Sequence, residues 1–206
     1  MHEVCIINYE LGNVLSLKNA LDKINVKSTI SREEKVISKS NFLVLPGVGS
    51  FEIGMKQLEK FNLIKILNNE VLNNNKKILG ICLGFQLMCK KSEEFGKING
   101  LGWIDLNVVK INTKNLKLPH TGWNALCDIK KNNKLMQNIE NENFFYFNHT
   151  FCINKNTDEK FKVLAKSKYE DEFISVGYKN NIFGIQPHPE KSQQNGLTFL
   201  KNLFVN

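Results

Sequence analysis

Arginine is nearly absent from this 206-residue chain, in which Arg32 is the only example. Lysine supplies the other basic residues, and 28 basic against 20 acidic residues give a net charge of +8. Nucleic-acid-binding surfaces usually gather basic residues into a stripe with interleaved aromatic side chains. The lysines here are scattered along the chain, so we expect no nucleic-acid partner despite the positive charge.

The sequence also lacks signals for export, membrane insertion and metal binding. No basic leader or cleavage site precedes the first apolar segment at residues 4–8, and no apolar run approaches the length of a membrane span. The five cysteines are odd in number and form no C-x-x-C pair, and no cysteines and histidines share metal-ligand spacing. We therefore expect a cytoplasmic protein with no membrane partner and no metal ion.

Length and composition predict one domain spanning residues 1–206. Hydrophobic residues make up 42% of the chain and charged residues 23%, which is ordinary for a soluble globular protein. A chain of this length can build one sizeable core but has little room for a second one.

The first half alternates short apolar runs with segments of helical spacing. This alternation is typical of βαβ units and predicts a parallel sheet covered by helices on both faces. The expected strands are residues 4–8, 26–30, 42–45 and 77–82, and the expected helices are residues 14–24, 55–61 and 64–71, with one more carrying Leu87 and Met88.

After about Gly96 the pattern changes to short β-rich segments. The segments are residues 103–111, 144–153, 161–165, 173–178 and 182–186, followed by a closing helix through Leu197, Leu200 and Phe204. We therefore predict an α/β fold with a mainly parallel central sheet flanked by helices and a more antiparallel β region in the second half.

The most informative segment places Cys82 between Gly80 and Gly84, where a predicted strand meets a predicted helix. Glycines around such a residue allow the tight turn of a nucleophile elbow, which holds the nucleophile exposed at the edge of a sheet. The N-terminus of the following helix stabilises negative charge and supplies amide donors. The alternative is a structural cysteine buried beside packing glycines, because free cysteines are commonly buried.

A thiol nucleophile needs a base, and the base needs a group that orients it. His188 follows a predicted strand, and Glu190 comes two residues later. The prolines at 187 and 189 restrict the backbone and would fix the imidazole at the edge of the sheet. Taken alone, the segment could equally be a solvated His-Pro turn with a surface glutamate.

A third segment, Gly47-Val48-Gly49, follows the predicted strand 42–45. Its glycines would let backbone N–H groups turn toward an oxyanion, and the amide of Leu83 could be a second donor. The alternative is an ordinary strand-to-helix loop.

These segments together resemble a known family. Pro-Gly-Val-Gly-Ser-Phe from Pro46, Gly-Ile-Cys-Leu-Gly-Phe-Gln from Gly80 and His-Pro-Glu-Lys-Ser from His188 are similar to the triad, or class I, glutamine amidotransferases. The segments Asn-Tyr-Glu-Leu-Gly-Asn, Pro-His-Thr-Gly-Trp-Asn and Tyr-Phe-Asn-His-Thr-Phe more closely resemble the glutaminase subunit of imidazole glycerol phosphate synthase. The resemblance covers nearly the whole chain and implies the three-layer fold of that family.

The resemblance implies a role for each matching position. Cys82 would attack the glutamine side chain and release ammonia, His188 would act as base and then acid, and Glu190 would orient it. No cofactor is needed for this chemistry. Further implied groups are an oxyanion hole of Gly47, Val48, Gly49 and Leu83, a glutamine site of Gly49, Gln86, His149, Thr150 and Phe151, and a partner interface with an ammonia gate at Asn13, Trp123 and Lys191. For Trp123 the alternative is packing, and for Lys191 it is a solvated charge.

The implied partner is a cyclase subunit with a (β/α)8 barrel, bound as a heterodimer in histidine biosynthesis. Trp103 and Glu10 instead resemble paralogues that serve surface-glycan synthesis, in which the partners include a separate sugar amidotransferase. A catalytically inactive scaffold is a further alternative.

Some positions depart from the family pattern. Pro187 stands where an aromatic residue is usual, Asn148 where valine is common, and Thr150-Phe151 where Ser-Tyr is usual.

Overall fold

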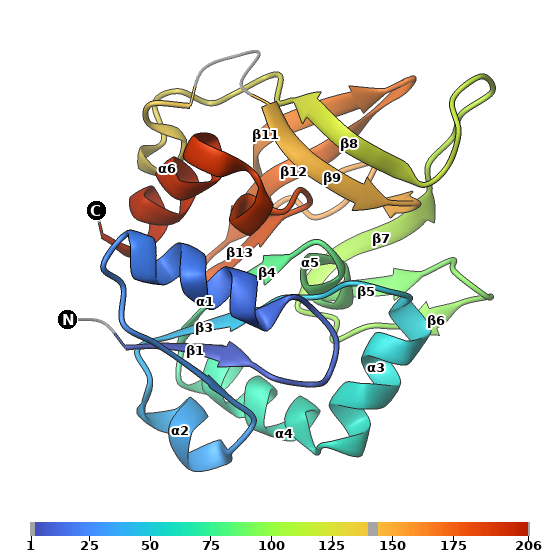
Figure 1. The fold of residues 1–206 in the computed structure, drawn as a ribbon. Coiled ribbons are helices and arrows are strands. Elements are labelled where there is room, and N and C mark those ends of the chain that lie inside the picture. Colours follow the sequence, from blue (N-terminus) through green and yellow to red (C-terminus); the bar gives the residue numbers. More distant parts are fainter. Residues whose placement is uncertain (1–2, 140–143, 206) are drawn as a thin grey trace.

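The computed structural model describes residues 3–139 and 144–205 and contains a seven-stranded sheet, a four-stranded sheet and a two-stranded sheet. The strand order of the large sheet is β11-β12-β13-β4-β3-β1-β2. Its five strands from β13 to β2 are mutually parallel, whereas β12 and β11 are added antiparallel at one edge. Figure 1 shows this sheet running through the molecule, with helices on both sides.

The bounds of the strands follow the chain as a parallel half and then a mostly antiparallel half. The strands are β1 (Val4–Ile7), β2 (Ser28–Ser31), β3 (Phe42–Leu45), β4 (Lys77–Ile81), β5 (Cys89–Ser92), β6 (Ile98–Asn99), β7 (Ile104–Lys110), β8 (His120–Ala125), β9 (Phe144–His149), β10 (Phe151–Cys152), β11 (Lys162–Tyr169), β12 (Asp171–Lys179) and β13 (Ile182–Ile185).

The α-helices of the described chain are α1 (Val14–Lys23), α2 (Glu34–Lys39), α3 (Phe51–Lys60), α4 (Leu63–Asn68), α5 (Leu83–Leu87) and α6 (Gln193–Phe204). A π-helical turn, Asn69–Asn73, continues α4, and 3-10 turns cover Lys134–Met136 and Pro189–Lys191. None of the helices within the described ranges is long and apolar enough to cross a membrane.

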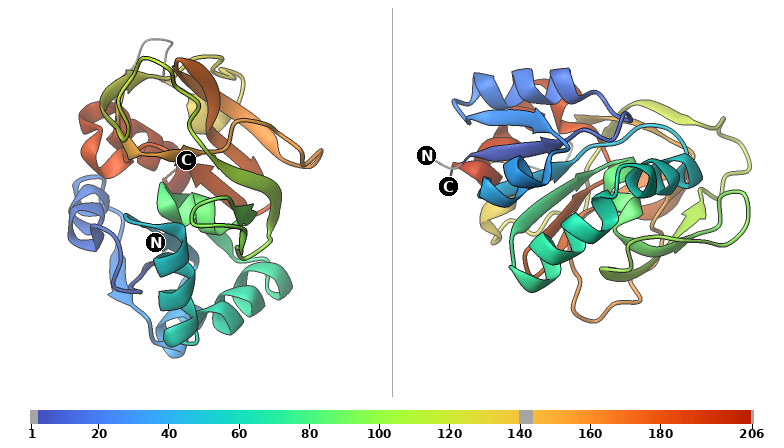
Figure 2. Two further views of the ribbon diagram at one scale, coloured as in Figure 1. Left: turned by 90° about the vertical axis from the view of Figure 1, so that its right-hand side faces the viewer. Right: turned by 90° about the horizontal axis from the view of Figure 1, so that it is seen from below.

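Alternation along the central strands sends side chains to two hydrophobic clusters, one on each face of the large sheet. In β1, Val4 and Ile6 join the cluster that includes the apolar faces of α1 and α6, while Cys5 and Ile7 join the cluster with α3 and α4. Figure 2 shows α1 and α6 together on one side of the sheet and α3 and α4 on the other. The helix–sheet–helix arrangement confirms the fold class predicted from the sequence.

The second half of the chain differs in detail from the expected elements. The predicted β segment 144–153 is divided at Thr150, because β9 pairs with β8 whereas β10 pairs with β7 in another sheet. The predicted strand 161–165 extends to Tyr169, where a turn at Glu170 with φ 58° leads into β12. The polar residues at the end of β11 hid this extension, and they belong to the strand because they pair with β12, even though Ser167 among them is completely buried.

Four short elements were not expected from the sequence. β8 contains glycine and asparagine, which have low strand propensity, and it exists because β9 pairs with it along its whole length. Helix α2 and strands β5 and β6 contain at most six residues each, too few for a periodic pattern. Within 64–71, the expected helix changes to a π-helical turn at Asn69.

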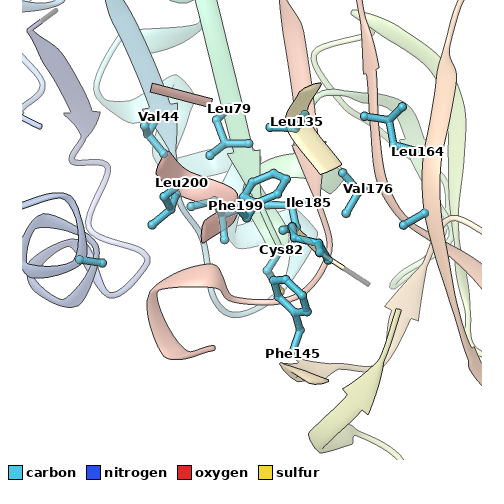
Figure 3. Close-up of a cluster of buried hydrophobic side chains, with 14 of the residues drawn as sticks. Val44, Leu79, Cys82, Leu135, Phe145, Leu164, Val176, Ile185, Phe199 and Leu200 are labelled. Atoms are coloured by element: carbon cyan, nitrogen blue, oxygen red, sulfur yellow. The ribbon is translucent and has the colours of Figure 1, made fainter. Parts of the chain in front are cut away.

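Helix α6 fastens the end of the chain to the sheet. Figure 3 shows Phe199 and Leu200 of this helix beside Leu79 and Val44 of the central strands. Phe199 is completely buried.

We expect Phe199→Ala to lower the free energy of unfolding by about 3–5 kcal/mol, because it leaves a cavity in this cluster. Urea denaturation measures the loss. Leu15→Ala is the control, since Leu15 is 66% exposed and its truncation should change stability by no more than about 0.5 kcal/mol. Equal effects of the two substitutions would contradict this description of the core.

Candidate active site

The three sequence segments of interest meet because three parallel strands end at the same level. Gly80 of β4 lies opposite Leu45 of β3 and opposite Gly184 of β13. The chain therefore leaves all three strands at one edge of the sheet. The loop 46–50, Cys82 and the segment 186–190 follow these strand ends directly.

Cys82 occupies the sharp turn between β4 and α5. Its backbone has φ 52° and ψ −110°, a region that a non-glycine residue adopts only under strain. The turn is held by a hydrogen bond from the Cys82 amide to the Ile185 carbonyl (2.8 Å). A Cβ on Gly84 would collide with the carbonyl of Leu45, and one on Gly80 would lie 2.7 Å from backbone atoms of Phe85. The two glycines are therefore required by the close approach of strands and helix.

His188 and Glu190 form an ordered pair at the same edge. His188 Nδ1 lies 2.9 Å from Glu190 Oε1, and only 1% of His188 is exposed. The His188 amide donates to the Tyr146 carbonyl (2.8 Å), and Ser192 Oγ donates to the His188 carbonyl (2.6 Å). These bonds fix the loop to β9. The other ring nitrogen, Nε2, is buried and has no hydrogen-bond partner among the described residues.

The charge state of His188 is determined by its neighbours. Burial lowers the pKa of His188, because it disfavours the imidazolium. Interaction with Cys82 and the hydrogen bond to Glu190 outweigh burial and raise this pKa to about 10. The surroundings thus favour the imidazolium form of His188.

The loop after β3 packs through Gly47 against the start of α5, at Leu83 and Gly84. Tyr9, which is fully buried, donates its hydroxyl to the Pro46 carbonyl (2.6 Å). A Cβ on Gly47 would collide with that hydroxyl and approach the Gly84 amide to 2.9 Å. Gly49 has φ 107° and open space around it. The Leu83 amide is at the first position of α5, where an amide has no partner within the helix.

A cavity of about 290 Å3 opens next to the thiol. Its volume suits a small polar molecule. The lining residues are Gly49, Cys82, Leu83, Gln86, Glu94, Pro119, Asn148, His149, Thr150 and Phe151. The cavity thus contains all five residues that the resemblance assigns to glutamine binding, together with Glu94, which no sequence motif marked.

Gln86 and His149 share an acceptor in the wall of this cavity. Gln86 Nε2 and His149 Nδ1 both lie 2.8 Å from the Phe151 carbonyl oxygen. Because a carbonyl only accepts, each of these nitrogens donates its hydrogen. The remaining ring nitrogen of His149, Nε2, lies 3.1 Å from His120 Nδ1. Both nitrogens of the His149 ring are therefore engaged by the protein.

The His120–His149 pair is buried and neutral. Burial lowers the pKa of His149 to about 3 and that of His120 to about 4. His149 Nε2 accepts from His120, and His120 Nε2 lies 3.2 Å from the amide nitrogen of Asn124, which also donates to the Lys168 carbonyl. One set of histidine tautomers satisfies all of these hydrogen bonds, from Asn124 through His120 to His149 and the Phe151 carbonyl.

Of the three residues of the predicted partner interface, Asn13 and Trp123 are exposed and Lys191 is half-buried. Trp123 on β8 is 48% exposed, and its ring is 6.1 Å from that of Tyr146. Lys191 Nζ lies 5.4 Å from the Tyr146 ring centre on the same patch. Asn13 is exposed and caps α1 by accepting from the Ser16 amide (3.2 Å). Helix α1 contacts the turn that carries Lys191.

Two further residues at the site had no clear sequence signal. Glu94 follows β5 in a polar stretch, and its Oε2 accepts from the Phe51 amide (2.7 Å). Gln186 lies two residues before His188, is completely buried and reaches the thiol. Only the three-dimensional contacts distinguish them from other polar residues.

The histidine pair predicts acid sensitivity. In the unfolded chain both histidines titrate near 6.5, whereas in the folded chain they titrate near 4 and 3. Below pH 6.5 the unfolded state binds more protons, so the free energy of unfolding decreases as the pH falls. Each histidine contributes at most about 1.4 kcal/mol per pH unit.

His120→Gln should reduce the slope of unfolding free energy against pH between 6.5 and 5. The reduction should be at most about 1.4 kcal/mol per pH unit, which corresponds to one proton fewer taken up on unfolding. Urea denaturation at several pH values measures this slope. An unchanged slope in a folded variant would show that His120 is not held neutral.

Comparisons with known proteins place these features in a family. The family profile "Glutamine amidotransferase class-I" matches residues 5–206. The chain is 42% identical to imidazole glycerol phosphate synthase subunit HisH 2 of Methanococcus maripaludis over 97% of both chains. It is 44% identical to subunit HisH 1 of Campylobacter jejuni serotype O:23/36, over 97% of this chain and 98% of that one.

Solved structures share the fold at low sequence identity. A crystal structure of a glutamine amidotransferase superposes with a TM-score of 0.75 at 16% identity, covering 96% of this chain and 97% of the other. A structure of PurLQS from Thermotoga maritima gives a TM-score of 0.68 at 17% identity, covering 98% of both chains. The chain belongs to the class I glutamine amidotransferases and, within them, to the family of imidazole glycerol phosphate synthase subunit HisH.

Proposed function

We propose that this chain is the glutaminase subunit of an imidazole glycerol phosphate synthase and hydrolyses glutamine to glutamate and ammonia. The observation that carries this proposal is Cys82 at a strained turn, beside a cavity and a buried histidine whose other nitrogen is held by Glu190. Membership of the HisH family supports the same reaction.

In this reaction the proton of the Cys82 thiol lies on His188 Nε2, and Cys82 Sγ attacks the side-chain amide carbon of glutamine. His188 then gives that proton to the leaving nitrogen, so that ammonia departs and a thioester remains. A water molecule, deprotonated by His188, attacks the thioester and releases glutamate. Glu190 holds the imidazole in one orientation and stabilises its positive charge, as the third residue of a triad does.

The negative charge on the substrate oxygen needs donors at the edge of the cavity. We assign this role to the amides of Leu83 and Gly49, with the Gly47–Val48 peptide completing the site by turning its N–H inward. The Tyr9 bond to the Pro46 carbonyl precedes this peptide and restrains the loop.

Polar groups of the cavity wall would hold the amino-acid end of glutamine. Glu94 is the carboxylate available for the α-ammonium, and Thr150 offers a hydroxyl in place of serine. Gln86 and Phe151 contribute through their shared hydrogen bond, and His149 shapes the wall, since both its ring nitrogens are engaged.

The ammonia would be consumed by a second subunit. The relatives are named as subunits of a synthase, and the implied partner is the cyclase barrel in a heterodimer. We assign Asn13, Trp123 and Lys191 to that interface because they lie at or near the surface around the turn Pro189–Lys191, which contains Glu190.

Trp103 and Glu10, which resemble the surface-glycan paralogues, have structural explanations here. Trp103 is buried, and its indole nitrogen donates to Asn68 Oδ1 (2.7 Å). Glu10 pairs with Arg32 (3.0 Å) at the surface and anchors the first loop. Neither contacts the cavity, so the histidine pathway remains the proposed destination of the ammonia.

Cys82→Ala should reduce glutamate release from glutamine by at least about a thousandfold, because the nucleophile is lost. Activity is measured with and without the cyclase subunit. Cys127→Ala is the control, as Cys127 is only half-buried and is not among the residues that line the cavity. Retained activity in Cys82→Ala would contradict the proposal.

Acivicin, an electrophilic glutamine analogue, should label Cys82 in the wild-type chain, as mass spectrometry of the modified peptide would show. An inactive scaffold would leave Cys82 unmodified.

The chain should restore growth without histidine, on ammonia-poor medium, to a strain that lacks its own histidine-pathway glutaminase. The Cys82→Ala chain is the matched control and should not. If the wild-type chain is well expressed and hydrolyses glutamine with another partner but does not restore growth, its ammonia goes to a different acceptor, such as a sugar.

A further inference from the structure

One buried polar side chain contacts the sulfur of Cys82 but has no place in the triad. Gln186 follows β13, is completely buried, and its Nε2 lies 3.5 Å from Cys82 Sγ. The main-chain N–H of Gln186 donates to the Ser175 carbonyl (2.8 Å), and this bond fixes the backbone of Gln186. A side chain so placed either donates to the sulfur through its NH2 group or presents its oxygen.

The neighbouring contacts determine which end of the Gln186 amide faces the sulfur. The Phe151 carbonyl can only accept, so Gln86 must direct its NH2 group toward it (2.8 Å). The same NH2 group lies 3.0 Å from Gln186 and therefore requires the Gln186 oxygen there. The Gln186 NH2 group is left to point at Cys82. A main-chain carbonyl thus sets the orientation of two glutamines in succession.

Donation to sulfur is most valuable when the sulfur is charged. A hydrogen bond to an ionised group is roughly twice as strong as one between neutral groups, and a buried site strengthens it further. The donor to the sulfur is the side chain of Gln186. His188 Nε2 has no other hydrogen-bond partner among the described residues and so remains available for the proton of the Cys82 thiol.

We propose that Gln186 is a positioning residue, oriented by Gln86 and the Phe151 carbonyl, that donates a hydrogen bond to the Cys82 thiolate and stabilises it for attack on the substrate. This inference rests on the proposed glutaminase reaction for its kinetic consequence but not for its effect on the thiol. Because Gln86 also lines the cavity, the same chain of hydrogen bonds connects the substrate site with the nucleophile.

The test uses Gln186→Met, whose unbranched side chain has similar length and no donor. The rate of Cys82 alkylation by iodoacetamide is measured against pH in the whole chain, with the modified peptide identified by mass spectrometry. The midpoint of this profile should move upward by about one pH unit, the shift expected when a charged hydrogen bond worth a factor of about ten is lost. Gln194→Met is the control, since Gln194 is exposed on α6, and should leave the midpoint unchanged.

Kinetics with glutamine and the cyclase subunit provide the second readout. In Gln186→Met, kcat should fall about tenfold while KM changes by no more than about twofold, because the bond acts on the nucleophile rather than on binding. A purely structural role would lower the amount of folded protein and leave the alkylation midpoint of the folded fraction unchanged. That result would overturn the proposal.

Gln86→Leu tests whether Gln86 orients the side-chain amide of Gln186. It should also raise the alkylation midpoint, and the double variant Gln86→Leu/Gln186→Met should shift it no more than Gln186→Met alone. Additive shifts would contradict the orienting role of Gln86. If Gln186→Met does not fold, Gln186→Leu replaces it.

The two proposals can fail separately. A wild-type chain without glutaminase activity would contradict the proposed function, whereas the alkylation profiles would still report on Gln186. An active wild type with identical profiles in all variants would contradict only the role of Gln186.

Discussion

The level ending of three parallel strands, β3, β4 and β13, is the constraint on which the site depends. Their backbone register brings the glycine loop, Cys82 and the His188 segment to one edge, although about 140 residues separate the first from the last. A shift of one residue in any of the strands would turn its side chains to the opposite face and move its loop out of reach. The hydrophobic alternation that fills the two clusters therefore also fixes the geometry of the catalytic residues.

Close packing at this edge is made possible by missing side chains. Gly47, Gly80, Gly84 and Gly184 all lie where a Cβ would meet another chain segment. The strained backbone of Cys82 is maintained by these contacts, since the neighbouring segments leave the turn no room to relax. Stability of the core and the placement of the nucleophile, buried at 4% exposure in the wall of the cavity, thus have the same origin.

Buried polar groups in this region are arranged by main-chain carbonyls. The Phe151 carbonyl orients Gln86 and His149, the Lys168 carbonyl orients Asn124, and the Tyr146 carbonyl holds the His188 amide. Carbonyls cannot change from acceptor to donor, so each one fixes the direction of the side chains bound to it. The second half of the chain supplies all three of these carbonyls, from β9, β10 and β11, which gives this less regular region a direct part in ordering the site.

The sequence by itself determined the α/β class, the strands of the parallel sheet and the candidate residues Cys82, His188 and Glu190, because periodicity and local motifs are written in neighbouring residues. Short elements such as α2 and β6 were missed, since they contain too few residues for a pattern, and β8 was missed because its partner strand creates it. Only the tertiary structure decided that Glu94 lines the cavity, that both nitrogens of His149 are engaged and that Gln186 reaches the thiol. Those facts depend on contacts between segments distant in the chain, which local sequence cannot encode.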